Sequence, residues 1–253
     1  MQKIYVAMHK PYLQPEDPLY VPIQVGAAGH SSFCPTRDDS GENISEKNQG
    51  FCELTALYWL RYNSDADVRG LVHYRRYFAS RYPLHRNKWK NILGDEELET
   101  LMQRVDLVLP RKRHYVIETT FSHYAHAHHE KDLHTVRSVI REQCPQYLPA
   151  FDIVMRKRSG HRFNMFIMKR EALHDYCDWL FPILFELEKR IDTSDYDDYN
   201  KRVFGFIAER LLDVWLMNRN YTYAERKILE IEKTNWLKKG SHFVWRKMKA
   251  IFG

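Results

Sequence analysis

The sequence predicts an α/β fold in which helices flank a largely parallel sheet. Short runs rich in β-branched and aromatic residues alternate along the 253 residues with longer runs whose apolar residues recur every three or four positions. The first strand-like run, residues 3–8 (KIYVAM), passes directly into the polar residues His9 and Lys10. Sheets that bind nucleotides begin in this way, with a strand that delivers a polar loop at its carboxyl end.

A long polar segment separates the first strands from the first predicted helix. Residues 36–48 have loop composition throughout, and long polar loops inside compact domains tend to be functional. Behind them Phe51, Leu54 and Leu57 recur at helical spacing, which predicts a helix over residues 49–62 with Asn48 as its cap. The remaining predicted elements, in chain order, are a strand over 70–74, a helix over 95–105, strands over 106–110 and 162–171, and helices over 172–190 and 201–219.

The charge balance and the missing motifs bound the function. Lys and Arg number 39 and Asp and Glu 33, which gives a formal charge of +6 and favours an anionic partner such as a nucleotide, a nucleic acid or a membrane surface. The four cysteines have no C-x-x-C spacing and the amino terminus has no long apolar run, so we expect a cytoplasmic protein. The fingerprints of P-loop ATPases, Rossmann dehydrogenases, α/β-hydrolases and zincins are absent from the sequence, which disfavours these classes.

The segment HYRRYF, residues 73–78, follows a predicted buried strand without a break. The polar groups of His73, Tyr74, Arg75 and Arg76 would then emerge at the strand's carboxyl end, where open α/β sheets bind ligands. Two guanidiniums there could neutralise a leaving diphosphate. The alternative is that the two arginines alternate across the sheet, one pairing with a carboxylate and the other facing water.

Two further polar groups are candidates for contacts with sugar or metal. The loop RDDSGENISEKN contains Asp38 and Asp39, which could hold a divalent metal or accept hydrogen bonds from ribose and sugar hydroxyls. The alternative is a solvated acidic turn. His161 and Asn164 lie near the entrance of a predicted strand, where they could touch the donor sugar or the acceptor, or form only a polar lead-in to a core strand.

Glu209, on the last long helical pattern, is the candidate general base. Apolar residues surround Glu209, and a carboxylate near an apolar helix face can take a proton from a reacting hydroxyl. Gly205, one turn earlier, would let another group approach this helix closely. The alternative is an ion pair between Glu209 and Arg210 or another arginine.

Six segments resemble, in chain order, the domain-of-unknown-function 4422 family found in capsule and exopolysaccharide gene clusters. They are KIYVAMHK, YVPIQVGAA, DDSGENISEKNQGFCELTALYWL, RGLVHYRRYF, FNMFIMKRE and RVFGFIAERLLDVWL, within residues 3–217. The resemblance implies a GT-A-like, Rossmann-like fold and a hexosyltransferase that uses a nucleotide-activated sugar, commonly UDP-linked, with some relatives similar to galactofuranosyltransferases. The implied acceptor is a glycan or a lipid-linked glycan of capsule, exopolysaccharide or O-antigen assembly.

The strand that ends in an Asp-x-Asp metal motif in many GT-A enzymes appears here as VHYRRY. The need for Mn²⁺ or Mg²⁺ is therefore open, with Asp38 and Asp39 as the ligands if a metal is required. Our hypothesis is an inverting transfer in which Glu209 is the base and the arginines stabilise the diphosphate. The nucleotide- and sugar-binding candidates are His9, Gln24, Val25, Gly26, Asp38, Asp39, Asn43, Ser45, Lys47, Asn48, His73, Tyr74, Arg75, Arg76, His161 and Asn164.

The carboxyl-terminal part of the chain changes composition abruptly. We expect a glycosyltransferase domain over residues 1–225 and a basic, aromatic tail over 226–253, suited to the anionic inner face of the plasma membrane. The alternative is a terminal helix packed on the domain. Two rival functions stay open, namely a non-catalytic module that binds nucleic acid or another polyanion, and a retaining or sugar-phosphate transferase. We expect no nucleic acid partner.

Overall fold

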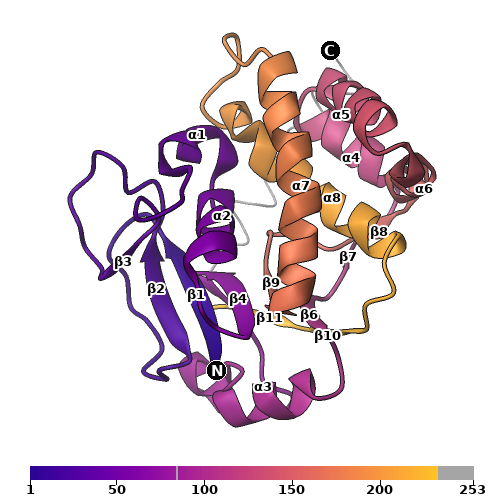
Figure 1. Ribbon diagram of the computed structural model, residues 1–253. Coiled ribbons are helices and arrows are strands. Elements are labelled where there is room, and N and C mark those ends of the chain that lie inside the picture. Colours follow the sequence, from indigo (N-terminus) through magenta and orange to yellow (C-terminus); the bar gives the residue numbers. More distant parts are fainter. Residues whose placement is uncertain (84, 233–253) are drawn as a thin grey trace.

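A central β-sheet separates two layers of helices in the computed structural model, which describes residues 1–83 and 85–232 (Figure 1). The strands are β1 (Gln2–Met8), β2 (Tyr20–Gln24), β3 (Thr36–Arg37), β4 (Val68–His73), β5 (Arg76–Phe78), β6 (Leu107–Pro110), β7 (Arg113–His114), β8 (Ser159–Gly160), β9 (Phe166–Lys169), β10 (Tyr223–Arg226) and β11 (Ile228–Glu230). The α-helices are α1 (Asn48–Phe51), α2 (Leu54–Asn63), α3 (Asp95–Met102), α4 (Thr120–Ala127), α5 (Glu130–Gln143), α6 (Leu148–Arg156), α7 (Arg170–Arg190) and α8 (Val203–Met217). The expected α/β fold is confirmed.

The sheet is mixed and mostly parallel, as predicted. Its main order is β10-β6-β9-β4-β1-β2-β3, and within this path β9 pairs antiparallel with both of its neighbours while every other pair is parallel. The chain runs from β1 to β2 on one side, and β4 returns to the other side of β1. The strand order reverses at this point, so the carboxyl ends of β1 and β4 flank the position where open sheets bind ligands.

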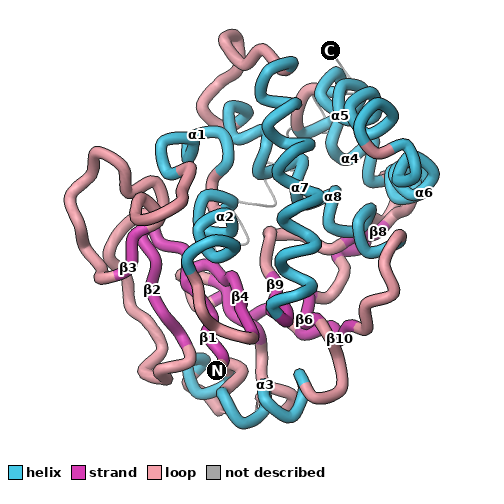
Figure 2. Tube along the Cα trace, in the orientation of Figure 1, coloured by secondary structure: helices cyan, strands magenta, loops and turns pink. Residues whose placement is uncertain are grey.

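Alternating side chains of β1 supply two separate cores. Tyr5 and Ala7 belong to the core beneath α2, α7 and α8, whereas Ile4, Val6 and Met8 belong to the core that includes Leu98 and Met102 of α3. A strand that is buried on both faces must be apolar at nearly every position, which explains the run IYVAM. Figure 2 shows the strands lying between α3 and the larger helical layer.

The helix predicted over residues 49–62 is interrupted. Cys52 has a φ of 52°, a left-handed conformation that a helix cannot continue, and it divides the segment into α1 and α2. Asn48 is the first residue of α1, with Lys47 in the cap position, and its Nδ2 donates to the carbonyl oxygen of Cys52 at 2.7 Å. The prediction of a single capped helix was therefore wrong.

The strand predicted over residues 162–171 is shorter, because β9 covers only residues 166–169 and α7 begins at Arg170. The preceding residues Phe163 and Asn164 have φ values of 81° and 48°, which no strand can accommodate. The helices predicted over 172–190 and 201–219 are confirmed as α7 and α8, and the predicted strand over 106–110 is confirmed as β6.

The proposed boundary at residue 225 was wrong. It falls inside β10, which pairs with β6, and β11 continues the sheet by pairing with β5. Residues 226–230 therefore belong to the folded domain, and residues 233–253 of the proposed tail lie outside the described residues. In the described part of the chain, no helix combines the length and the apolar character needed to cross a bilayer.

Candidate functional site

Polar and cationic side chains gather where β1 and β4 end. The Tyr74 hydroxyl lies 3.3 Å from Nε2 of His9, and the Arg75 guanidinium lies over the Tyr74 ring, 4.8 Å from its centroid. Burial lowers the pKa of His9, and the charges of Arg75, Lys10, Arg202 and His73 lower it further, so these groups share one field. We call His9, Lys10, His73, Arg75 and Arg202 the cationic edge, and its positive charge is carried by Lys10, Arg75 and Arg202.

The two arginines of HYRRYF take different directions from the end of β4. Arg75 lies in the turn and pairs with Glu232 at 3.2 Å, and both side chains are 41% exposed. Arg76 starts β5, pairs with Glu230 at 3.6 Å and lies over the Phe163 ring. Both arginines therefore emerge at the predicted end of the sheet, and each has a carboxylate partner from the segment that follows β10.

Backbone groups of Phe163 are held from two sides. Its N–H donates to Oε1 of Glu209 at 3.0 Å, and its carbonyl oxygen lies 2.6 Å from Nε2 of His73. A non-glycine residue with a φ of 81° is strained, and such strain persists only where neighbours hold the backbone. Glu209 and His73 thus join α8 and β4 through this turn.

Glu209 is also paired with its neighbour on α8. Its Oε2 accepts a hydrogen bond from Arg210 at 2.9 Å, and the Arg210 side chain is almost fully buried. The alternative considered for Glu209, an ion pair with Arg210, is therefore present. The carboxylate stays 18% exposed beside the cationic edge, so it is held in place without being sealed from a ligand.

Asn164 links this turn to Glu53, a carboxylate that is not among the site residues predicted from the sequence. Its Nδ2 donates to Oε1 of Glu53 at 2.7 Å and to the carbonyl oxygen of Gly205 at 3.0 Å. Glu53 precedes α2, is largely buried, and lies 4.0 Å from Nε2 of His73. The signal in the sequence was an isolated acidic residue in the run FCELTALYWL, which is otherwise apolar or uncharged.

Asp38 is a structural hub of the loop that follows β2. It is fully buried, its Oδ1 accepts from Ala27 N and Ser45 Oγ, and its Oδ2 accepts from Gly26 N and Thr55 Oγ1. All four distances lie between 2.5 and 2.9 Å, so each carboxylate oxygen already has two donors. Asp38 therefore does not fit the predicted roles of metal ligand or ribose acceptor.

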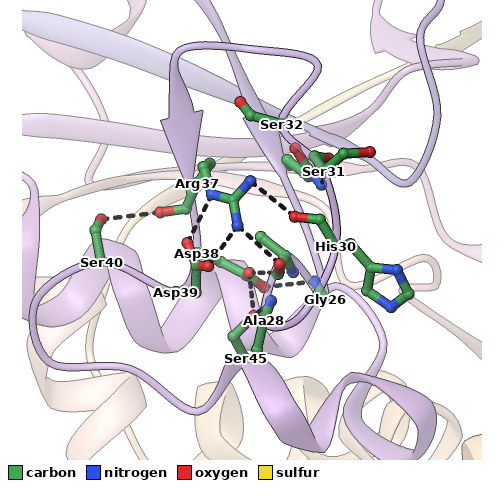
Figure 3. Close-up of polar contacts among 12 residues, drawn as sticks. Gly26, Ala28, His30, Ser31, Ser32, Arg37, Asp38, Asp39, Ser40 and Ser45 are labelled. Carbon is green, nitrogen blue, oxygen red and sulfur yellow. Dashed lines mark hydrogen bonds and ion pairs between the residues drawn. The ribbon is translucent and has the colours of Figure 1, made fainter.

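Arg37 braces the same loop from the other side (Figure 3). It donates to the carbonyl oxygens of Ala27 and His30 and forms a two-bond pair with Asp39. The hydrogen bonds from Arg37 hold the pKa of Asp39 below its usual value. Within the described residues, no group of three or more His, Cys, Asp or Glu side chains is arranged to hold a metal. Asp38 and Asp39 thus do not fit a divalent metal site.

The other candidates from residues 24–48 also build this loop. Gln24 bonds the backbone of Ser31 and Phe33, and Asn43 bonds Gly41 and Ser45. Val25 packs against the core, and Lys47 forms an ion pair with Glu188. Gly26 has a φ of 61°, and a Cβ there would lie 2.7 Å from Oδ1 of Asn48. Only backbone groups and the outer rim of this loop are left to contact a ligand.

His161 lies apart from the cationic edge. Its side chain is fully buried, its Nδ1 lies 2.5 Å from Asp213, and its Nε2 lies 3.3 Å from Glu225. The backbone N–H of His161 donates to the same Asp213 carboxylate. The expectation that His161 touches the donor sugar or the acceptor is not met, because its ring is enclosed between α8 and β10.

A groove of about 1030 Å³ is lined by Lys201, the chain neighbour of Arg202 in the cationic edge. One wall is the loop braced by Arg37 and Asp38, from Ala28 to Phe51, and the other runs from Glu188 at the end of α7 to Phe204 at the start of α8. The groove and the cationic edge therefore lie on the same side of the sheet, at the carboxyl ends of its parallel strands.

Comparisons with known proteins give one family and one solved structure. The family model described as "Domain of unknown function (DUF4422)" matches residues 3–220. The structure described as "WbbM bifunctional glycosyltransferase apo structure" is 29% identical in sequence and superimposes with a TM-score of 0.85 over 92% of this chain. The match covers 45% of that structure's own chain. No curated protein sequence matches.

Proposed function

We propose that this chain, which belongs to the DUF4422 family, is a glycosyltransferase that moves a sugar from a nucleotide-sugar donor to a glycan or lipid-linked acceptor. The likeness to a bifunctional glycosyltransferase supports this reaction class. More specifically, we propose that the transferred sugar is a hexose, of which galactofuranose is the first to test. We propose that the donor is UDP-linked and that the anomeric carbon is inverted. The proposed setting is capsule, exopolysaccharide or O-antigen assembly.

The cationic edge is the observation that carries the proposal. A leaving nucleoside diphosphate concentrates negative charge, and the cations Lys10 and Arg75, which follow β1 and β4, can stabilise it. The Arg75 side chain is 41% exposed, and its Nη1 pairs with Glu232 at 3.2 Å. A phosphate oxygen can therefore reach this guanidinium by taking the place of that carboxylate.

In the proposed step, the acceptor hydroxyl gives its proton to a carboxylate while its oxygen attacks the anomeric carbon. The bond from that carbon to the diphosphate oxygen breaks, and the nucleoside diphosphate leaves with the electron pair. We propose Glu209 as the proton acceptor, because each of its oxygens accepts one hydrogen bond and keeps a second lone pair. Glu53 is the rival, since its Oε2 makes no hydrogen bond within the described part of the chain.

Binding of the donor is tested by thermal shift against UDP-, GDP-, CMP- and dTDP-sugars, each with and without Mn²⁺. We expect a UDP-sugar to raise the melting temperature, and Arg75→Ala to weaken its binding by roughly ten-fold or more, as for one lost charge-assisted bond. Arg104→Ala is the matched control, because Arg104 is exposed and follows α3 on the opposite side of the sheet. Equal affinities for both variants would overturn the role of Arg75.

The same screen tests the metal. Because Asp38 and Asp39 are occupied by other donors, we expect the UDP-sugar to bind equally well with Mn²⁺, with Mg²⁺ and with excess EDTA. Loss of binding in EDTA would contradict charge neutralisation by side chains alone and would require metal ligands outside this loop.

A pair of amide variants identifies the base. Glu209→Gln should abolish transfer while UDP-sugar binding stays measurable, and Glu53→Gln should leave a larger residual rate. If Glu53→Gln alone abolishes transfer, then Glu53 is the base and Glu209 only holds the turn at Phe163. A fully active Glu209→Gln protein excludes Glu209 as the proton acceptor.

Three further measurements address the rival functions and the location. Strongly salt-dependent RNA binding without UDP-sugar binding would favour the nucleic-acid module. The anomer of the product separates inverting from retaining transfer, and a sugar-phosphate product would indicate the third alternative. We also propose that residues 236–253 contact the inner face of the plasma membrane, so the full chain should co-sediment with anionic vesicles and not with neutral ones.

A further inference from the structure

We propose that the groove between residues 28–51 and 188–204 binds a neutral saccharide, as the subsite for the acceptor glycan. This inference rests on the proposed function and adds the chemical class and the location of the second substrate. The volume of the groove, about 1030 Å³, is at the upper end of the range for small-molecule sites, so the groove is larger than one monosaccharide requires.

Charge separates this groove from the cationic edge. The charged residues that line it are Asp39, Glu46, Lys47, Glu188 and Lys201, so acids outnumber bases by one. Four of these charges are already paired inside the protein, Asp39 with Arg37, Lys47 with Glu188, and Lys201 with Asp198. Such a lining offers a diphosphate no net positive charge to offset the cost of removing its own charge from water. A neutral ligand with many hydroxyl groups does not carry that cost.

Several polar side chains of the groove are free to bind such a ligand. Glu46, Gln49 and Thr193 line it, and none of the three side chains makes a hydrogen bond or an ion pair within residues 1–83 and 85–232. A carboxylate, an amide and a hydroxyl together supply donors and acceptors, which is what a saccharide's hydroxyl groups require. Two of them stand on the loop wall and Thr193 stands on the opposite wall.

The walls are held at a fixed separation. Lys47 Nζ of the loop wall lies 2.8 and 2.9 Å from the two oxygens of Glu188 at the end of α7. At the inner end the two walls touch, since a Cβ on Gly50 would lie 3.0 Å from the Phe204 ring. A preorganised groove loses little entropy on binding, which favours selective recognition of a flexible glycan.

The inner end of the groove adjoins the cationic edge. Phe51 and Lys201 line the groove, and the next residues along the chain, Cys52 and Arg202, meet at 3.1 Å between Sγ and Nε. Arg202 belongs to the cationic edge. A glycan lying in the groove would thus point one end toward the site proposed for the donor diphosphate, as transfer between two bound substrates requires.

The test fills the groove without touching the cationic edge. Gln49→Trp places a bulky ring in the groove, and Gln103→Trp is the matched control at an exposed position after α3, on the other side of the sheet. Saturation-transfer NMR with a panel of octyl glycosides, from mono- to tetrasaccharides, measures saccharide binding to the full chain. Calorimetry with UDP measures the nucleotide site, and circular dichroism checks that each variant is folded.

We expect at least one octyl glycoside to bind the wild type, Gln49→Trp to raise its Kd by roughly ten-fold or more, and Gln103→Trp to leave it unchanged. The affinity for UDP should be equal in all three proteins. Thr193→Trp, on the opposite wall, should repeat the result if Gln49→Trp fails to fold. Unchanged glycoside binding in a folded groove variant, or no glycoside binding to the wild type, overturns the subsite.

The two proposals fail in different ways. A wild type that binds glycosides in the groove but no nucleotide sinks the proposed transferase and leaves a saccharide-binding groove. A groove variant that loses UDP and keeps the glycoside overturns the assignment of the groove, because the nucleotide would then occupy it.

Discussion

Replacing Asp38 by Asn tests whether this buried carboxylate organises the loop beside the candidate site. The substitution preserves the volume but turns one acceptor oxygen into an NH₂ donor. In either orientation of the amide, the new NH₂ group faces one fixed backbone N–H, from Gly26 or Ala27, and one hydroxyl, from Thr55 or Ser45. The hydroxyl can rotate and accept instead, whereas the backbone N–H cannot.

The expected loss of stability follows from that geometry. A buried backbone N–H without an acceptor costs about 1–3 kcal/mol, and the remaining bonds lose the strength that a charged acceptor gives them. We therefore expect a fall of about 3 kcal/mol in the free energy of unfolding. For a chain of this size each kcal/mol lowers the melting temperature by about 2–4 °C, so the fall should be about 6–12 °C.

The assay is urea unfolding followed by circular dichroism, with Asp39→Asn as the control. The neighbouring Asp39 carries the same functional group and pairs with Arg37, but both side chains are 24% exposed. A partly exposed pair contributes about 1 kcal/mol or less. If Asp38→Asn loses no more stability than Asp39→Asn, then the four hydrogen bonds do not carry the energy assigned to them. If Mn²⁺ stabilises the wild type but not Asp38→Asn, then Asp38 is a metal ligand after all.

Two further predictions concern stability. Gly26→Ala should destabilise more than Gly29→Ala, by about 1 kcal/mol or more in urea unfolding, because both have positive φ but only a Cβ at Gly26 collides with Asn48; equal losses would exclude the close approach. Burial lowers the pKa of His128 from 6.5 to about 4, although a hydrogen bond with Asn200 opposes the shift. Its folded pKa lies below its unfolded one, so its contribution is complete above about pH 6.5 and is lost as the pH falls toward 4. His128→Asn should flatten that part of the stability profile, and an unchanged slope would show that the histidine is not buried as described.

Elements with a regular pattern of apolar residues were predictable from the sequence. The helices α7 and α8 and the strands β1 and β6 follow directly from the spacing of apolar residues, because burial of one face or of both faces leaves a periodic record. The interruption of the predicted helix at Cys52 and of the predicted strand at Phe163 could not be recognised from the spacing of apolar residues. Their left-handed backbones are imposed by partners far along the chain, such as Glu209, and not by glycine or proline.

The candidate site shows the same division. The position of the candidate site was predictable, because polar residues directly after a buried strand must emerge at its carboxyl end. The cationic edge lies there. Whether a side chain is available to a ligand was not predictable, because an acidic residue looks the same in sequence whether its oxygens are free or already accept hydrogen bonds. The donors that occupy Asp38 come from as far as Thr55, and the partner of His161 is Asp213.

The ion pair between Arg75 and Glu232 gives the cationic edge a built-in competitor. An incoming phosphate that takes Arg75 must exchange places with a carboxylate of the same chain, so the measured affinity is the difference between two pairings. Both side chains are 41% exposed, and such a pair contributes about 1 kcal/mol or less, so the exchange is easily driven by a doubly charged ligand. Added salt weakens the pairing of Arg75 with Glu232 as well as its pairing with the phosphate. Nucleotide binding should therefore depend less on ionic strength than it would if Arg75 had no carboxylate partner.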